Sequence, residues 1–181
     1  MFTSLFRAES TGDRSPWGDF YFEPTGARSV SGMRVSADAA LRLAAVYACV
    51  RILSETMASL PIVVYRTRPD GGKDRIKDHW LYHRLARTPN RYQNPFEWRE
   101  MLQGHLTLRG NAYCQILANA KGEITELLPI HPDRVRLEML SNGDYRYRIS
   151  QAGGAELVLP RGEVWHLRGL SSDGLVGMSP I

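Results

Sequence analysis

The histidines and arginines are the residues in this sequence whose types and spacing could support chemistry. His79 and His83 lie four positions apart in "HWLYH", a spacing that puts two imidazoles on one face of a helix and occurs in zinc sites. The metalloprotease pattern also requires a glutamate after the first histidine, but Trp80 stands there, and no third ligand lies at a suitable spacing. We therefore expect no metal site and interpret the pair as surface or packing histidines.

The remaining polar motifs define no reaction. His105 falls inside a helical pattern, His131 in the turn "PIHPD" and His166 in the strand-like stretch "VWHLR". The sequence contains no nucleophile elbow, no phosphate-binding glycine loop and no cysteine–histidine pair. The loop "SSDGLVGMSP", which contains Asp173, could bind a ligand, and sequence alone leaves a paired-carboxylate site open. We predict no catalytic residue and no cofactor.

The arginines are more informative. Arg134 and Arg136 alternate on a predicted strand, with Glu138 next on the same face, and Arg146 and Arg148 share a face of the following strand. An Asn-Gly hairpin signal separates the two strands, so the arginines can gather around the glutamate. A solvated sheet face, a protein–protein surface and contact with a nucleic-acid backbone remain open, in that order of preference.

The composition is that of a globular chain. Its 181 residues are 43% hydrophobic and 23% charged, and 20 arginines and three lysines against 19 acidic residues give a net charge of +4. A small positive charge permits nucleic-acid binding and equally permits arginine-rich protein interfaces. No apolar run is long enough to span a membrane and no signal peptide is visible. Cys49 and Cys114 are expected to be free, buried thiols of an intracellular protein.

Helical patterns dominate the first part of the chain. Residues 1–34 show no periodicity and are rich in Gly, Ser and Pro, which predicts a mobile arm with an unusual aromatic stretch at 17–22. A single helix capped by Ser36 and ended by Pro61 follows, and its two apolar faces predict packing on more than one side. We expect it to be the longest helix and to pack on the helix that Asn94 and Pro95 begin.

From Ala112 onward the apolar period changes from helical to two. Six short strands are predicted, separated by turn signals such as Lys121-Gly122 and Gly153-Gly154. An additional hairpin is expected where 62–68 meets Pro69-Asp70-Gly71-Gly72, and a short helix at 78–87. The predicted fold class is α+β, with N-terminal helices packed on an antiparallel β meander.

Several stretches, taken in order, resemble the N-terminal part of a tailed-phage portal protein of the lambdoid siphophage type. They are "AVYACVRILSETMASLPIVVYR", "HRLARTPNRYQNPFEWREMLQGHLTLRGNAYCQI", "ITELLPIHPDRVRL" and "VWHLRGLSSDGLVGMSPI". The resemblance covers residues 35–181, which would form an incomplete portal wing domain. Portals are structural proteins, so it provides no catalytic residues.

The resemblance implies a ring, usually of twelve subunits, at one capsid vertex of the virion, assembled in the host cytoplasm. Double-stranded DNA would enter and leave through the ring without sequence preference, and capsid and scaffold proteins would contact it. The terminase and the head–tail adaptor would bind the clip, which, like the stem and crown, is absent from this sequence. Arg134, Arg136, Arg146 and Arg148 are our candidate subunit-interface residues.

The end of the sequence fits this resemblance. Ser179 is a good helix N-cap and Pro180 suits the first helical position, so "SPI" is expected to open the helix that leads toward the stem. A terminal turn is the simpler interpretation of the same residues. The alternative to a portal segment is a nucleic-acid-binding or enzymatic α+β module unrelated to portals.

Overall fold

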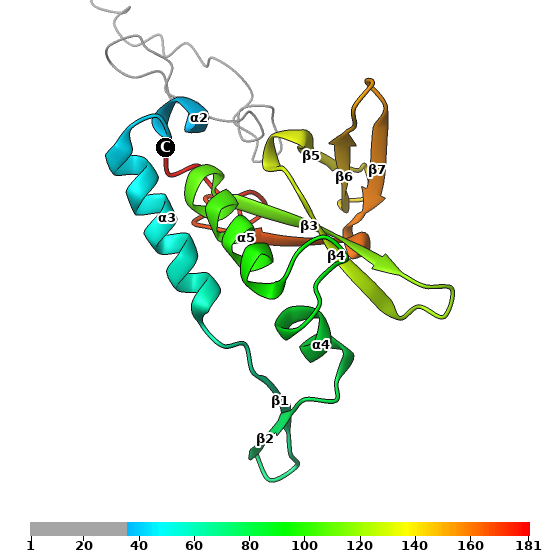
Figure 1. Ribbon diagram of the computed structural model, residues 1–181. Helices are drawn as coiled ribbons and strands as arrows, with labels where there is room; N and C mark the ends of the chain where they lie inside the picture. The colour runs from blue at the N-terminus through cyan, green and yellow to red at the C-terminus, as the bar shows by residue number, and fades with distance from the viewer. Residues whose placement is uncertain (1–35) are drawn as a thin grey trace, which may run out of the picture.

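The computed structural model describes residues 36–181, so the predicted arm at 1–34 lies outside the described residues. The predicted α+β class is confirmed: helices lie on one side of the molecule and antiparallel sheets on the other (Figure 1). The helices are α2 (Ala37–Ala40), α3 (Ala44–Ser59), α4 (Trp80–Ala86) and α5 (Pro95–Arg109). The strands are β1 (Val64–Thr67), β2 (Lys73–Ile76), β3 (Asn111–Ala118), β4 (Ile124–Ile130), β5 (Val135–Met139), β6 (Tyr145–Ser150), β7 (Glu156–Pro160) and β8 (Val164–Arg168). Within residues 36–181, no helix is long and apolar enough to cross a membrane.

Helix α5 begins where the sequence predicts. The Asn94 side chain accepts hydrogen bonds from the backbone N–H groups of Phe96 and Glu97, at 2.9 and 3.0 Å. The Glu97 carboxylate accepts from the Asn94 N–H at 3.0 Å, which completes a capping box. At the other end Gly110 adopts φ +70°, the left-handed conformation that closes helices. The boundaries of α5 therefore follow from local sequence.

We expect Asn94→Ala to lower the free energy of unfolding by about 1 kcal/mol, because two N–H groups lose their acceptor. Asn94→Asp is the matched control, since aspartate caps equally well and should leave stability nearly unchanged. Urea denaturation of the three proteins measures both effects. Equal stability of the alanine and aspartate variants would contradict the capping role.

The prediction of a single helix from Ser36 to Pro61 is wrong, because the chain forms two helices there, α2 and α3. Ser36 caps only the short α2, its hydroxyl accepting from the Ala39 N–H at 3.1 Å, and α3 starts after an extended Leu43. Asp38 forms an ion pair with Arg109 at 3.0 Å, which holds α2 beside the end of α5. This long-range contact holds α2 as a helix separate from α3.

Helix α3 packs along α5, as predicted, and with 16 residues it is the longest helix of the described part. Its small residues Ser54 and Ala58 are buried, and the Ser54 hydroxyl lies close to Gly104 of α5. Arg99 of α5 donates to the Leu60 carbonyl at 2.7 Å. Packing on a second side is not seen among residues 36–181, where most of the rest of α3 is exposed, including Cys49, which we expected to be buried.

The strands from β3 onward form two three-stranded sheets instead of one continuous meander. The first sheet has the order β4-β3-β8 and the second has the order β5-β6-β7, while β1 and β2 form a separate hairpin that projects from the molecule (Figure 1). Only β5-β6-β7 is a simple meander. After β7 the chain returns, and β8 pairs antiparallel with β3, so β3 becomes a central strand.

Strand β3 separates two apolar cores because its side chains alternate between the two faces of the sheet. Ala112 and Cys114 face the helices, where Trp98 of α5 is buried and donates to the Leu127 carbonyl at 3.1 Å. Tyr113 faces the other way, into the core shared with β5-β6-β7. The second sheet is thereby fixed against the first.

Candidate functional site

The predicted arginine–glutamate grouping forms on the outer face of the β5-β6-β7 sheet. The β5–β6 register places Glu138 opposite Arg146 and Arg136 opposite Arg148. Arg148 donates to both carboxylate oxygens of Glu138, at 2.9 and 3.1 Å, and to Glu156 at 2.7 Å, while Arg146 also donates to Glu138. We call Glu138, Arg146, Arg148 and Glu156 the arginine–glutamate cluster.

The charges of this cluster balance one another. Hydrogen bonds from Arg146 and then Arg148 lower the pKa of the Glu138 carboxyl to about 2, so it remains ionised. Two guanidinium groups therefore face two carboxylates, and little net positive charge is left for a phosphate backbone. Of the three interpretations left open by the sequence, this arrangement favours a solvated face or a protein surface over nucleic-acid contact.

The other two candidate arginines differ from each other. The prediction that Arg134 lies on the strand is wrong: it belongs to the 3-10 turn Pro132–Arg134, and its guanidinium donates to the Ser150 carbonyl at 2.7 Å. Arg136 lies on β5 and is exposed, and none of the ion pairs among residues 36–181 includes it. Of the four, Arg136 is thus the guanidinium most available to a partner.

The predicted absence of a histidine metal site is compatible with the geometry. His79 caps α4, its ring nitrogen accepting from the Leu81 N–H at 3.2 Å, and His83 is exposed on the same helix. His131 accepts from the Asp133 N–H, which fits the predicted turn role. In the part of the chain that the structure describes, no group of three or more His, Cys, Asp or Glu side chains could hold a metal ion.

The Asp173 side chain stabilises the conformation of its own loop. The Asp173 carboxylate accepts from the backbone N–H groups of Leu175 and Val176, at 2.7 and 2.9 Å, and from the Ser171 hydroxyl at 2.8 Å. Although burial opposes ionisation, these hydrogen bonds lower the pKa of the carboxyl. All three bonds end on Oδ1, so this carboxylate oxygen is used to hold the conformation of the loop.

Asn111, the first residue of β3, has a side chain that contacts residues far away in the sequence. Its side-chain amide donates to the Gly177 carbonyl at 2.7 Å, and its oxygen accepts from the Gly177 N–H, also at 2.7 Å. The same oxygen lies 2.9 Å from His166 Nε2, and His166 Nδ1 lies 3.2 Å from the Tyr147 hydroxyl. Asn111 thus joins β3 to the C-terminal segment, residues 169–181, and through His166 to the second sheet.

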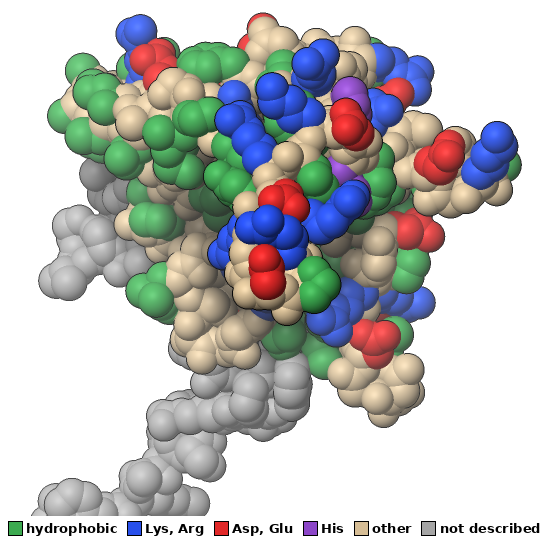
Figure 2. All heavy atoms as spheres, turned by 90° about the horizontal axis from the view of Figure 1, so that it is seen from below, with side chains coloured by type: hydrophobic (Ala, Val, Ile, Leu, Met, Phe, Trp, Pro, Cys, Tyr) green, Lys and Arg blue, Asp and Glu red, His purple; other side chains and the backbone are tan. Residues whose placement is uncertain are grey.

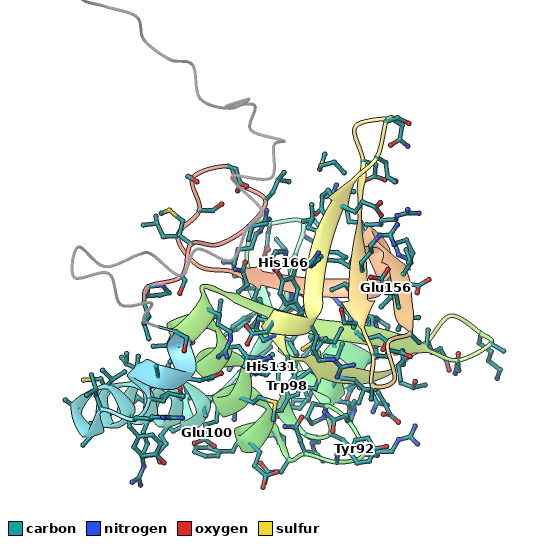
Figure 3. All side chains as sticks on the ribbon, turned by 90° about the horizontal axis from the view of Figure 1, so that it is seen from above. Tyr92, Trp98, Glu100, His131, Glu156 and His166 are labelled. Carbon is teal, nitrogen blue, oxygen red and sulfur yellow. The ribbon has the colours of Figure 1, made fainter. Side chains whose placement is uncertain are left out.

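Burial keeps His166 neutral, and its contacts select the tautomer. Asn111 presents an acceptor to Nε2, so that nitrogen carries the proton and Nδ1 accepts from the tyrosine hydroxyl. Burial, with a smaller effect of Arg168, lowers the pKa of His166 to about 3. Figure 3 shows His166 between the C-terminal segment and the second sheet, with Glu156 on the far side of that sheet. The predicted strand role of His166 is confirmed.

The C-terminal segment rests closely on the end of α5. Gly177 leaves no room for a side chain, because a Cβ there would overlap the Gly110 carbonyl oxygen. The Ser179 hydroxyl donates to the Leu108 carbonyl at 3.0 Å and accepts from the Ile181 N–H at 3.3 Å. The second bond is the one expected of a helix N-cap. The arrangement fixes the position and direction of residues 177–181.

A family comparison accounts for this domain. The family model described as phage portal protein matches residues 44–181, which run from the start of α3 to the end of the C-terminal segment. The chain belongs to the phage portal protein family. The resemblance seen in the sequence is thereby confirmed, and a portal segment is favoured over an unrelated nucleic-acid-binding or enzymatic module.

Individual portal relatives match over most of this chain. The portal protein of Enterobacteria phage HK97 is 31% identical over 143 residues, covering 78% of this chain and 33% of the relative. The probable portal protein of Streptomyces phage phiC31 is 31% identical over 166 residues, covering 86% and 35%. Protein BeeE of Escherichia coli (strain K12) is 36% identical over 121 residues, covering 64% and 76%. The chain therefore spans about a third of the length of the two phage portals.

Solved structures share the fold. One is a chain in the neck of an empty gene transfer agent particle, computed with C6 symmetry, with a TM-score of 0.68 and 22% sequence identity. The match covers 80% of this portal chain and 40% of the neck chain. A chain in the neck of the native particle, computed with C12 symmetry, gives 0.62 at 22% identity, over 84% and 39%. At this level of identity the likeness establishes the fold.

Proposed function

We propose that this chain is a structural subunit segment of a portal ring at one vertex of a phage-type capsid. In this role it forms the wing, the outer α+β part of each subunit, and has no enzymatic activity of its own. The observation that carries the proposal is the family match over residues 44–181, which includes both sheets and the segment docked on Asn111. The fold shared with chains in particle necks supports it.

The proposed partners follow from the same role. Neighbouring portal subunits would complete a ring of twelve, and capsid and scaffold proteins would surround its wings. Double-stranded DNA would pass through the channel without base-specific contacts, moved by the terminase, and a head–tail adaptor would attach below. We assign none of residues 36–181 to the channel or to these docking functions.

A chimaera tests the proposal directly. Residues 44–181 would replace the matching region of the HK97 portal protein, which is 31% identical. We expect the chimaera to form closed rings in electron micrographs, as the parent portal does under the same conditions. The 181-residue chain alone should be a monomer or a weak, heterogeneous oligomer by light scattering, since a heterologous ring must close at every interface.

Two results would count against this view. A folded chimaera that stays monomeric, while the parent forms rings, would contradict the portal role of this segment. A stable dodecamer of the 181-residue chain would contradict the expectation that wing contacts alone are insufficient.

We further expect Arg136→Glu to reduce ring yield in the chimaera at low salt, and added salt to restore part of the yield by screening the new like-charge repulsion. Its guanidinium is exposed and free of ion pairs within the described residues, so it can meet a carboxylate on a neighbour. Each exposed pair is worth about 0–1 kcal/mol, so the effect is a shift in yield and not abolition.

The matched comparison is the double variant Arg146→Glu, Arg148→Glu. Because these residues also hold the arginine–glutamate cluster together, this variant should lower the thermal midpoint of the isolated chain, whereas Arg136→Glu should not. Unchanged ring yield and salt sensitivity in both chimaeras would identify Arg136, Arg146 and Arg148 as a merely solvated face.

A further inference from the structure

One face of α3 is apolar and uncovered. The exposed fractions of Ile52, Leu53, Met57 and Leu60 are 63, 51, 49 and 51%, and Cys49 is exposed beside them. Positions 49, 53, 57 and 60 follow helical spacing, and 52 lies next to them, so they form one continuous strip. We call these five residues the α3 stripe. Hydrophobic side chains gather over this edge of the molecule in Figure 2.

The α3 stripe is also free of charge. Helix α3 contains two charged residues, Arg51 and Glu55, and they pair with each other at 2.6 Å on another side of the helix. The stripe therefore offers no ion pair to a polar partner and favours an apolar one. A contiguous apolar patch of this kind is typical of a surface that binds another segment or protein.

The chain itself carries a suitable occupant. Its first 35 residues, which lie outside the described residues, contain the aromatic sequence "WGDFYF" at 17–22. We propose that this aromatic segment covers the α3 stripe. Trp17, Phe20 and Phe22 supply the large apolar side chains that the uncharged stripe requires.

The length of the intervening chain permits this contact. Thirteen residues lie between Phe22 and Ser36, and the fourteen Cα–Cα steps of an extended chain reach about 45 Å. Helix α3, with 16 residues, is about 24 Å long, and it begins at Ala44, eight residues after Ser36. Tethering raises the effective concentration to roughly millimolar, so a weak apolar contact suffices and has the advantage over a second copy at micromolar concentration.

Cys49 provides the measurement, because it lies within the stripe. Cys114 is the internal control: it is 1% exposed and burial raises the pKa of its thiol to about 12, so it should not react. We would follow labelling of Cys49 by a thiol reagent in the full chain and in the variant Trp17→Ser, Phe20→Ser, Phe22→Ser. The expected result is labelling about tenfold faster in the variant, the change produced when a cover populated about nine-tenths of the time is lost.

The matched control is Phe2→Ser, Phe6→Ser, which removes two aromatic side chains from the first 35 residues but none from 17–22. It should label at the wild-type rate. Equal rates in wild type and the triple variant would overturn the proposal. A wild-type rate that falls as protein concentration rises would also overturn it, since a second copy would then cover the stripe.

A photo-crosslinking residue at position 20 tests the contact while Trp17 and Phe22 remain in place. Intramolecular crosslinks to the peptide that contains the α3 stripe are expected. Crosslinks confined to other peptides of the domain would contradict the proposed location.

Discussion

Gly110→Ala is expected to destabilise the domain by about 2–4 kcal/mol. Gly110 has φ +70°, a conformation that costs a residue with a Cβ about 1–2 kcal/mol. In addition, the new Cβ would overlap the backbone carbonyl of Met178, which cannot turn aside as a flexible side chain could. The C-terminal segment would have to leave the end of α5, and the hydrogen bonds between Asn111 and Gly177 would be lost with it.

Gly143→Ala is the matched control for this experiment. Gly143 has a similar φ of +83°, but no atom lies within 4 Å of the position a Cβ would take. We expect its substitution to cost only the conformational part, about 1–2 kcal/mol. The difference between the two variants in urea denaturation therefore measures the close approach of the C-terminal segment.

Hydrogen exchange supplies a second readout. The Gly177 amide, which donates to Asn111, should exchange faster in the Gly110 variant and at the wild-type rate in the Gly143 variant. Equal losses of stability in the two variants would show that the C-terminal segment does not rest on Gly110.

The second large effect is a loss of stability in mild acid. Two half-buried histidines are kept neutral: burial is the main cause, and it lowers the pKa of His105 to about 4 and that of His166 to about 3. In the unfolded chain a histidine titrates near its ordinary pKa of about 6.5. Between these values the unfolded state binds more protons than the folded state.

The free energy of unfolding is therefore highest above pH 7 and falls as the pH drops from about 6.5 toward 4 for His105, and toward 3 for His166. At about 1.4 kcal/mol per pH unit, each histidine removes roughly 2 kcal/mol by pH 5. Carboxyl groups whose pKa is lowered, such as Asp133 and Asp173, contribute stability that is lost only near and below pH 4. A change in the free energy of unfolding between pH 7 and 5 therefore reports mainly on His105 and His166.

Urea denaturation at pH 7, 6 and 5 checks this expectation. His166→Gln should be less stable than wild type at pH 7, because its contacts with Asn111 and Tyr147 are disturbed, but should lose about half as much stability on acidification. His105→Gln should flatten the profile in the same way, and the double variant should be nearly independent of pH in this interval. A wild-type slope retained in the double variant would assign the acid loss to other groups.

Features whose causes lie a few residues apart could be predicted from the sequence. Asn94, Pro95 and Glu97 specify where α5 begins, and Gly110 where it ends, because caps and left-handed closures act within one helical turn. The Asn-Gly turn at 142–143 fixes the β5–β6 register and hence the arginine–glutamate cluster. The residues of the longer stretches and their order were sufficient to predict the family.

Tertiary structure decided the features that depend on residues far apart in the chain. The pairing of β8 with β3 joins Asn111 to Arg168, and the break between α2 and α3 accompanies the ion pair of Asp38 with Arg109. Asn111 shows no local signal for its role, since its partner Gly177 lies 66 residues away. The apolar period of α3 predicts burial, but a period reports only which residues share a face. Whether that face is covered depends on which other parts of the molecule reach it, and here α5 reaches only the side with Ser54 and Ala58.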